Sequence, residues 1–278
     1  MKKEKTDLPL NYITIKTTQS RIDKGLLAIP VSLIDIFPNT ATKIYLIDEK
    51  GNKEEKTFTP YNSSSRECRI GGMKSFYRRF NIRNNDELVV QILDDNVFRI
   101  IPEKIFQNTF KLYLNNFDKS ETDSDIEDNL KLLSNLSNLS KKEILQNEFV
   151  RLSMEDISER KIVQNKNVLS REKVNYSLRK ILLELYKGKC QISNFTFLMK
   201  NGIPYFELHH IDSNKGNHLK NILVVSPNIH AQFTYCELVQ TFDEEGWLRK
   251  VKFNNEQEMN VFQIIDYLPK KFEKEIHL

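Results

Sequence analysis

The stretch that decides how this chain folds and acts is residues 205–233, YFELHHIDSNKGNHLKNILVVSPNIHAQF. Residues 205–211 and 221–225 have the composition of two short β-strands, and the polar residues between them are typical of a loop. Ser226-Pro227 predicts a helix start, because serine caps the first turn and proline lacks only an N–H that would have no partner there. The stretch therefore predicts strand, loop, strand and helix, in that order.

Histidines are concentrated in the same stretch. Four of the five in the chain, His209, His210, His218 and His230, fall between positions 209 and 230. The predicted order of elements brings the end of a strand close to the first turn of a helix, where two imidazoles can share a divalent cation while a neighbouring imidazole serves as a base. We expect His218 to be a loop residue or a phosphate contact, and His277 to be exposed without a role.

Three segments carry a resemblance to a known family. Residues 207–211 (ELHHI), 221–225 (NILVV) and 226–233 (SPNIHAQF) resemble the HNH endonuclease motif of the ββα-metal nucleases. Upstream, residues 176–182 (YSLRKIL) and 189–192 (KCQI) resemble the helix and knuckle that usually precede this motif. The resemblance covers roughly residues 171 to 240 and implies cleavage of phosphodiester bonds.

The resemblance also implies roles for individual residues. His210 would be the general base that takes a proton from the attacking water, and His209 and His230 would be metal ligands. Asn221 would be the asparagine of the HNH motif, which holds the loop in place and orients His210. A phosphodiester anion repels hydroxide, so a hard cation such as Mg²⁺ would neutralise the phosphate while the base supplies the nucleophile.

The cysteines depart from the family pattern. Many HNH proteins bind a structural zinc through two CxxC pairs, and here the matching positions read CQIS at 190–193 and SPNI at 226–229. One thiol of four remains, so we expect no structural zinc. Without zinc, the knuckle at residues 189–192 would have to be held by packing. We expect Phe195, Phe197 and Phe206 to pack against the preceding helix. Asp212 is expected in a turn, with a ligand role as the alternative.

The N-terminal part has another pattern. Short apolar runs at residues 12–15, 43–47, 87–92 and 97–101, separated by turn residues, predict a mostly β domain with helical insertions at 30–37 and 72–80. Two polar, basic stretches, 19–25 and 61–72, contain residue types that read base edges or hold phosphates. The expected DNA-binding residues are Gln19, Arg21, Asp23, Lys24, Asn62, Ser64, Arg66, Glu67 and Arg69.

These stretches, with residues 25–30, 76–80 and 86–90, look similar to the B3-like DNA-recognition domain of some restriction endonucleases. That resemblance implies a β pseudobarrel whose two arms, at 19–25 and 62–69, grip the duplex. The alternative is that both stretches are ordinary solvated loops.

The expected organisation is α+β with two domains. Residues 1–104 would form the B3-like recognition domain, 105–170 a helical linker region and 171–278 the HNH endonuclease domain. The acidic run at 118–125 has the composition of a linker. Ser140 and Glu143 have the spacing of a capping box, which predicts a helix start. A helix before the knuckle is expected to end at Gly188.

Composition limits the classes of protein. The chain has 278 residues, with 42 basic and 38 acidic residues and a formal net charge of +4, which permits a polyanion partner without requiring one. No apolar run is long enough to span a bilayer, and the first residues do not resemble a signal peptide, so a cytoplasmic location and reduced thiols are expected.

The expected function is that of a type II restriction endonuclease, a Mg²⁺-dependent, site-specific deoxyribonuclease of a restriction-modification system. Because one such centre cuts one strand, double-strand cleavage would be easiest in a homodimer, formed through the helical segment 129–186. Two alternatives remain: a modification-dependent DNA endonuclease, and a sequence-specific DNA-binding protein whose HNH module is inert. RNA is a weaker substrate candidate because the sequence shows no stacking-aromatic RNA signature.

Overall fold

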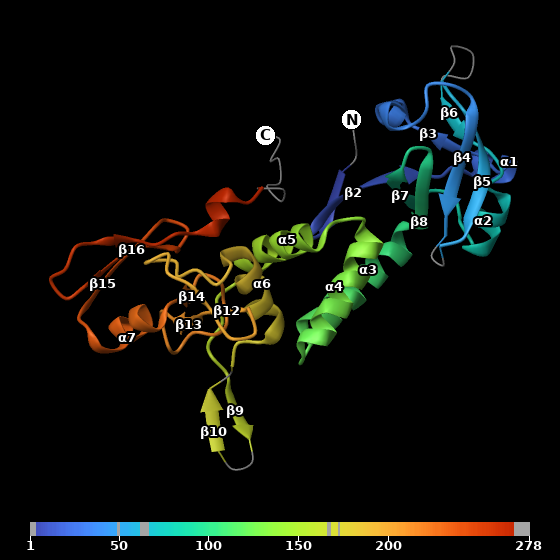
Figure 1. The fold of residues 1–278 in the computed structure, drawn as a ribbon. Coiled ribbons are helices and arrows are strands. Elements are labelled where there is room, and N and C mark those ends of the chain that lie inside the picture. Colours follow the sequence, from blue (N-terminus) through green and yellow to red (C-terminus); the bar gives the residue numbers. More distant parts are fainter. Residues whose placement is uncertain (1–3, 49–50, 62–66, 166–167, 172, 270–278) are drawn as a thin grey trace. The chain divides into compact units, whose positions relative to one another are not determined.

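The computed structural model describes residues 4–48, 51–61, 67–165, 168–171 and 173–269. The chain forms two compact units, each considered by itself. Unit 1 contains residues 1–114 and 133–138, and unit 2 contains residues 115–132 and 139–278. The helical region expected at 105–170 is therefore divided between the two units. Mixed helices and strands confirm the α+β class (Figure 1).

Unit 1 is built on one eight-stranded sheet with the order β1-β2-β7-β8-β4-β5-β6-β3. Its pairs are antiparallel except β4 with β8, which run parallel. The runs expected to be strands are β2, β4, β7 and β8. The strands are β1 (Glu4–Leu8), β2 (Leu10–Lys16), β3 (Leu27–Ile29), β4 (Thr42–Ile47), β5 (Lys53–Thr59), β6 (Cys68–Ile70), β7 (Glu87–Asp94) and β8 (Val97–Pro102).

The sheet curls around a single apolar core, as expected for a pseudobarrel. Strands from both ends of the sheet contribute to this core, for example Ile15 from β2 and Leu27 from β3. Phe37 stacks on Phe58 at 5.6 Å and on Phe98 at 4.6 Å between ring centroids. Burial of these aromatic rings contributes to the hydrophobic stabilisation of the unit.

Short helices connect the strands of unit 1. They are α1 (Gln19–Lys24), a 3₁₀ helix η1 (Val31–Ile36) and α2 (Lys74–Arg79). The insertions expected at 30–37 and 72–80 are therefore helical. The stretch 19–25, expected only as a polar connection, also contains a helix, which ends at Gly25 with a φ of 66°. Gly25 relieves the steric cost of this left-handed cap.

Two longer helices follow, α3 (Glu103–Asp118) and α4 (Asp123–Ser137), and each has residues in both units. The linker expected at 118–125 is thus a short connection between helices. In unit 1 the end of α4 is held to the sheet, because Gln91 donates to the carbonyl of Leu136 at 2.8 Å. Asn138 likewise donates to the carbonyl of Ile92 at 2.8 Å.

Unit 2 begins its compact part with two capped helices, α5 (Lys141–Ser153) and α6 (Tyr176–Tyr186). The predicted capping box is present, since the Ser140 hydroxyl accepts from the Glu143 amide at 3.2 Å and the Glu143 carboxylate accepts from the Ser140 amide at 2.9 Å. Helix α6 ends in left-handed residues at Lys187, with φ 54°, and Gly188, with φ 65°. No helix in the described residues is long and apolar enough to cross a bilayer.

Small sheets complete unit 2. The predicted strand, loop, strand and helix are all present, as β13, β14 and α7, and Figure 1 shows them close together. A three-stranded sheet that the sequence did not predict follows them. The elements are β9 (Ile162–Asn165), β10 (Val168–Arg171), β11 (Phe197–Leu198), β12 (Pro204–Tyr205), β13 (Glu207–His210), β14 (Ile222–Val225), α7 (Pro227–Tyr235), β15 (Leu238–Phe242), β16 (Leu248–Phe253), β17 (Met259–Asn260) and the 3₁₀ helix η2 (Ile264–Tyr267).

The knuckle is held by a buried glutamine more than by aromatic packing. Phe206 is buried, and the Arg179 guanidinium of α6 lies 4.3 Å from its ring, but Phe195 is 53% and Phe197 43% exposed, so the expected packing is wrong for these two. Gln191 is 4% exposed; its side chain accepts from the Val224 amide at 2.8 Å and donates to the Phe262 carbonyl at 2.8 Å. These bonds connect the knuckle to β14 and to the chain after β17.

We predict that Gly188→Ala destabilises unit 2 by about 2 to 3 kcal/mol, because a left-handed alanine is strained and added atoms overpack a filled site. A Cβ at Gly188 would lie 2.4 Å from the Cβ of Pro204. Gly202→Ala is the matched control: its φ is 78°, yet nothing lies within 4 Å of the added Cβ. Urea unfolding of both variants should show the larger loss for Gly188→Ala; equal losses would contradict this account.

Candidate functional site

The pairing of β13 with β14 positions the histidines of the cluster. The two strands are antiparallel, with Glu207 opposite Val225, His209 opposite Leu223 and His210 opposite Ile222. Side chains alternate between the two faces of a strand, so Glu207 and His209 share one face. Strand β14 is buried along its whole length, which anchors the more exposed β13.

Helix α7 completes the cluster. It begins as predicted, with Ser226 accepting from the Ile229 amide at 3.5 Å and Pro227 at the first helical position. His230 is therefore in the first turn, and its ring lies 5.2 Å from that of His209 between centroids. The structure brings these two expected metal ligands together.

A carboxylate that was not among the predicted site residues holds His230. The Nδ1 of His230 lies 2.5 Å from Oε2 of Glu207, whose other oxygen accepts from the Tyr205 hydroxyl at 2.8 Å. The bond to His230 is the main cause that lowers the pKa of Glu207. Because the carboxylate accepts, Nδ1 of His230 carries a proton, which leaves Nε2 as the nitrogen that would bind a cation. The two-residue spacing from His209 was the signal that could have identified Glu207.

His209 is held in its neutral form. Its ring stacks on Phe233 at 4.2 Å between centroids, and burial, with the nearby His230 and His210, lowers its pKa to about 4. Burial disfavours the charged imidazolium, and the neighbouring rings add to this effect. A metal ligand must be deprotonated, so His209 meets this requirement at neutral pH.

Asn221 organises the loop between the strands, as expected from its place in the motif. It is 3% exposed, and its side chain accepts from the Asp212 amide at 2.9 Å. Its amide nitrogen lies 3.1 Å from each of three loop carbonyls, those of Asp212, Lys215 and Gly216. The ring of His210 is bonded to another residue, Asn217, whose Oδ1 lies 3.0 Å from Nε2.

The other polar residues of the loop have structural roles. His218 is 6% exposed; its Nδ1 accepts from the Lys220 amide at 3.1 Å and its Nε2 lies 2.9 Å from the Glu155 carbonyl. Both ring nitrogens are therefore engaged inside the protein, so of the two expected roles His218 is a loop residue and not a phosphate contact. Asp212 accepts from the Asn214 amide at 2.9 Å, as in a turn, and His277 lies outside the described residues.

The donor set of this site consists of two imidazoles. His209 and His230 would hold a divalent cation, with Glu207 fixing the orientation of His230. Within the described part of the chain, no three His, Cys, Asp or Glu residues gather as a metal site. Water and phosphate oxygens would therefore complete the coordination, as they commonly do for Mg²⁺.

In unit 1 the two stretches expected to be arms are joined by one carboxylate. Glu67 pairs with Arg21 of α1 at 2.6 Å and with Arg69 of β6 at 2.6 Å. The two stretches are thus in direct contact at Arg21 and Glu67. Gln19 donates to Asp23 at 2.8 Å on the exposed side of α1. Asn62, Ser64 and Arg66 lie outside the described residues.

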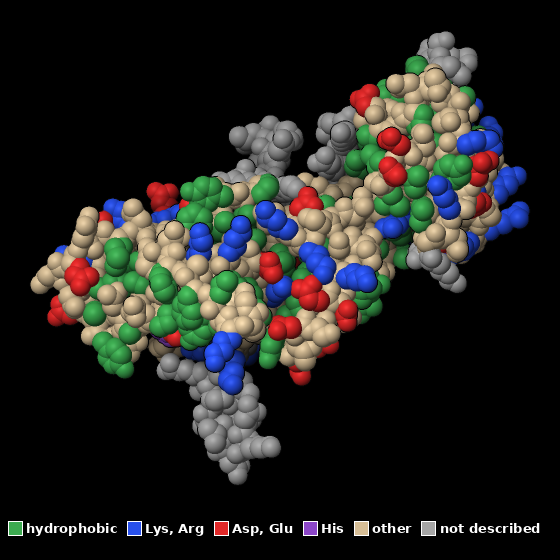
Figure 2. Space-filling model, in the orientation of Figure 1, with side chains coloured by type: hydrophobic (Ala, Val, Ile, Leu, Met, Phe, Trp, Pro, Cys, Tyr) green, Lys and Arg blue, Asp and Glu red, His purple; other side chains and the backbone are tan. Residues whose placement is uncertain are grey.

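Basic side chains gather along the neighbouring helices α1 and α2. Figure 2 shows Lys and Arg concentrated at this edge of unit 1. Lys74 of α2 lies against Gly25, the cap residue of α1, so the two helices are adjacent. Such a cluster creates a local positive potential that attracts polyanions. The basic residues of this surface, called the basic edge below, are Arg21, Lys24, Lys74, Arg78 and Arg79.

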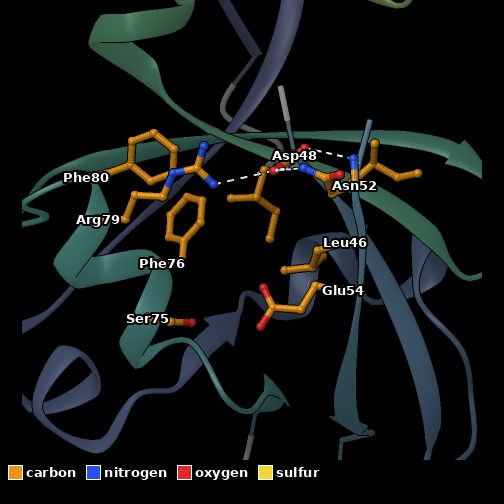
Figure 3. A pocket seen from close by; sticks show the side chains of 10 residues that line it. Leu46, Asp48, Asn52, Glu54, Ser75, Phe76, Arg79 and Phe80 are labelled. Carbon is orange, nitrogen blue, oxygen red and sulfur yellow. Dashed lines mark hydrogen bonds and ion pairs between the residues drawn. The ribbon is translucent and has the colours of Figure 1, made fainter. Parts of the chain in front are cut away.

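A pocket of about 280 Å³ lies beside α2, between that helix and strands β4 and β5. Figure 3 shows Phe76 and Phe80 on one side of it and Asp48 with Asn52 on another. Asp48 accepts from the Asn52 amide at 2.8 Å and from its side chain at 2.9 Å, and pairs with Arg79 at 3.5 Å. These polar groups satisfy one another, so the pocket offers less chemistry than the histidine cluster.

Comparisons with known proteins give little support for any family. No family model matches the chain, and no curated protein matches it. Among solved structures, a likeness is found to one described as an Arabidopsis FUS3-DNA complex, with a TM-score of 0.25 and 14% sequence identity. It covers 32% of this chain and 92% of that chain.

We predict that metal-free unit 2 loses stability as the pH falls from about 6.5 to about 4, because an unfolded His209 takes up a proton that the folded one resists. The slope of the unfolding free energy against pH is proportional to the number of protons taken up on unfolding. In His209→Gln this number should be smaller by nearly one in the same pH window. Urea unfolding in a pH series, with a chelator present, measures both slopes. Identical slopes would show that His209 titrates normally in the folded chain.

Proposed function

We propose that the chain is a metal-dependent DNA endonuclease of the restriction type, in which unit 2 cleaves the phosphodiester bond and unit 1 selects the site. This proposal rests on one observation: the rings of His209 and His230 lie 5.2 Å apart between centroids. His210, the proposed base, directly follows His209 in the sequence. The carboxylate of Glu207, 2.5 Å from His230, supports the proposal by fixing the protonated nitrogen of the His230 ring.

Each residue of the cluster has a defined task in hydrolysis. His210 takes a proton from the attacking water, whose oxygen forms a bond to phosphorus while the bond to the 3′ oxygen breaks. His209 and His230 would hold a divalent cation, which would supply positive charge near the phosphate and the leaving oxygen. Glu207 and the Asn221-bound loop hold these imidazoles in place, which reduces the cost of reaching the reactive geometry.

The identity of the cation follows from the donors. Mg²⁺ prefers oxygen ligands and keeps several waters, so two imidazoles would hold it weakly. Imidazole suits ions such as Zn²⁺ and Ni²⁺ better. The two imidazoles therefore favour an ion such as Zn²⁺ or Ni²⁺ over the Mg²⁺ that the resemblance implies, and the assays below compare these three ions with Mn²⁺.

The basic edge of unit 1 supports a DNA partner for that unit. It combines five Lys and Arg residues of two adjacent helices with the Glu67 bridge between Arg21 and Arg69. Lysine and arginine contacts to phosphates position a protein on the duplex, while side chains such as Gln19 can read base edges. Because one metal centre cuts one strand, we further propose that two copies act together on a site.

We predict that the wild-type chain converts unmethylated phage DNA into discrete fragments with a divalent cation, and that His210→Ala slows cleavage by about 10² to 10⁴-fold, the usual contribution of a general base. Asn214→Ala is the control, because Asn214 lies in the same loop with an exposed side chain. Gel electrophoresis of time courses with each of the four cations measures the rates.

The other outcomes separate the alternatives. Cleavage only of methylated DNA would identify a modification-dependent enzyme. DNA binding without cleavage under any cation would indicate an inert module and overturn the nuclease proposal. Nicking that is independent of protein concentration would contradict two cooperating copies.

We predict that the double variant Lys24→Ala, Lys74→Ala weakens DNA binding and reduces the slope of log affinity against log salt by about 2, since each phosphate contact contributes about 0.9. Lys43→Ala removes a lysine of β4 that pairs with Glu55 at 2.5 Å, and serves as the control with an unchanged slope. Fluorescence anisotropy on the His210→Ala background prevents cleavage during the measurement. Unchanged slopes in both variants would exclude the basic edge as a DNA-binding surface.

A further inference from the structure

The side chain of Asn217 joins the ring of His210 to a distant part of unit 2. Its Oδ1 lies 3.0 Å from Nε2 of His210, and its Nδ2 donates to the backbone carbonyl of Lys173 at 2.9 Å. Lys173 closely follows strand β10 and is 44 residues from Asn217 in the sequence. The base of the proposed reaction is therefore held through a contact that residues 205–233 alone do not contain.

These two bonds determine which way the amide of Asn217 faces. A backbone carbonyl can only accept a hydrogen bond, so the group facing Lys173 must be the NH₂ of the side chain. The oxygen of the amide consequently faces His210. The assignment of oxygen and nitrogen, which is often ambiguous for asparagine, is here fixed by the hydrogen-bond partners.

The orientation of Asn217 also determines where His210 carries its proton. An amide oxygen only accepts, so Nε2 of His210 must donate, and in the singly protonated form of the ring the lone pair is on Nδ1. A general base needs its lone pair on the nitrogen that meets the water, because the wrong tautomer cannot accept the proton.

We propose that Asn217 is a positioning residue that fixes the tautomer of His210 and so makes Nδ1 the atom that accepts the proton from water. The assignment rests on the proposed nuclease function for its catalytic meaning. The task differs from that of Asn221, whose side chain bonds to the loop backbone at Asp212, Lys215 and Gly216 and so holds the path of the loop.

The test measures the tautomer directly, in the full chain labelled with ¹⁵N. Long-range ¹H–¹⁵N correlations of the imidazole distinguish the protonated ring nitrogen from the other one, at about pH 8, where an ordinary histidine is neutral. The signals of His210 are identified by their loss in His210→Ala. The variants are Asn217→Leu, which removes both bonds, Asn217→Asp, which keeps an acceptor for His210, and Asn214→Leu, a change of the same kind at an exposed position of the same loop.

In the wild-type chain we expect the proton on Nε2, and in Asn217→Leu a mixture of tautomers with kcat reduced by about 10²-fold or more and KM for DNA little changed. Asn217→Asp should restore the tautomer and most of kcat, and Asn214→Leu should change neither. Thermal unfolding shows whether each variant remains folded. Restoration by Asn217→Asp separates positioning from a merely structural role, since the aspartate cannot repair the bond to Lys173.

Two results would overturn the assignment: a wild-type His210 that is protonated on Nδ1, or a folded Asn217→Leu whose tautomer is unchanged. A wild-type protein with the expected tautomer but no cleavage under any cation would instead refute the nuclease function and would support the contact between Asn217 and His210. The two failures are therefore distinguishable.

Discussion

The antiparallel register of β13 with β14 is the constraint on which the site depends. With His209 opposite Leu223, alternation places Glu207 and His209 on the same face, where the first turn of α7 brings His230. A shift of this pairing by one residue would exchange the two faces and separate the carboxylate from its imidazole. The fully buried strand β14 opposes such a shift, because its apolar side chains would lose their packing.

Local patterns in the sequence were sufficient to predict much of this arrangement. The order strand, loop, strand and helix, the Ser226 cap and the Ser140 capping box each depend on residues within a few positions of one another. The position of Glu207 in the site could also have been predicted, because residues two positions apart in a strand lie on the same face and Glu207 is two residues before His209. The bonds of Gln191 to Val224 and Phe262 could not, since they join residues 33 and 71 positions apart.

The same distinction applies to unit 1. Four of its strands were evident from short apolar runs, but the parallel pairing of β4 with β8 joins Tyr45 to Val97, and no local signal specifies it. Arg21 and Glu67 are 46 positions apart in the sequence. Composition predicts that their two stretches are polar loops, but it does not predict that they are in contact. In unit 2 the missing zinc ligands led us to expect Phe195 and Phe197 to pack against the preceding helix, yet these two side chains are 53% and 43% exposed.

The hairpin β9–β10 is attached to the histidine loop at both of its ends. Before it, the Arg160 amide donates to the Asn214 carbonyl at 2.8 Å and the Gly216 amide to the Ser158 carbonyl at 2.8 Å. After it, the carbonyl of Lys173 accepts from Asn217. Relatives of this chain should therefore tolerate insertions and deletions within the hairpin, because loop length costs little free energy. A single residue gained or lost between either attachment point and the adjoining strand would instead displace the loop itself.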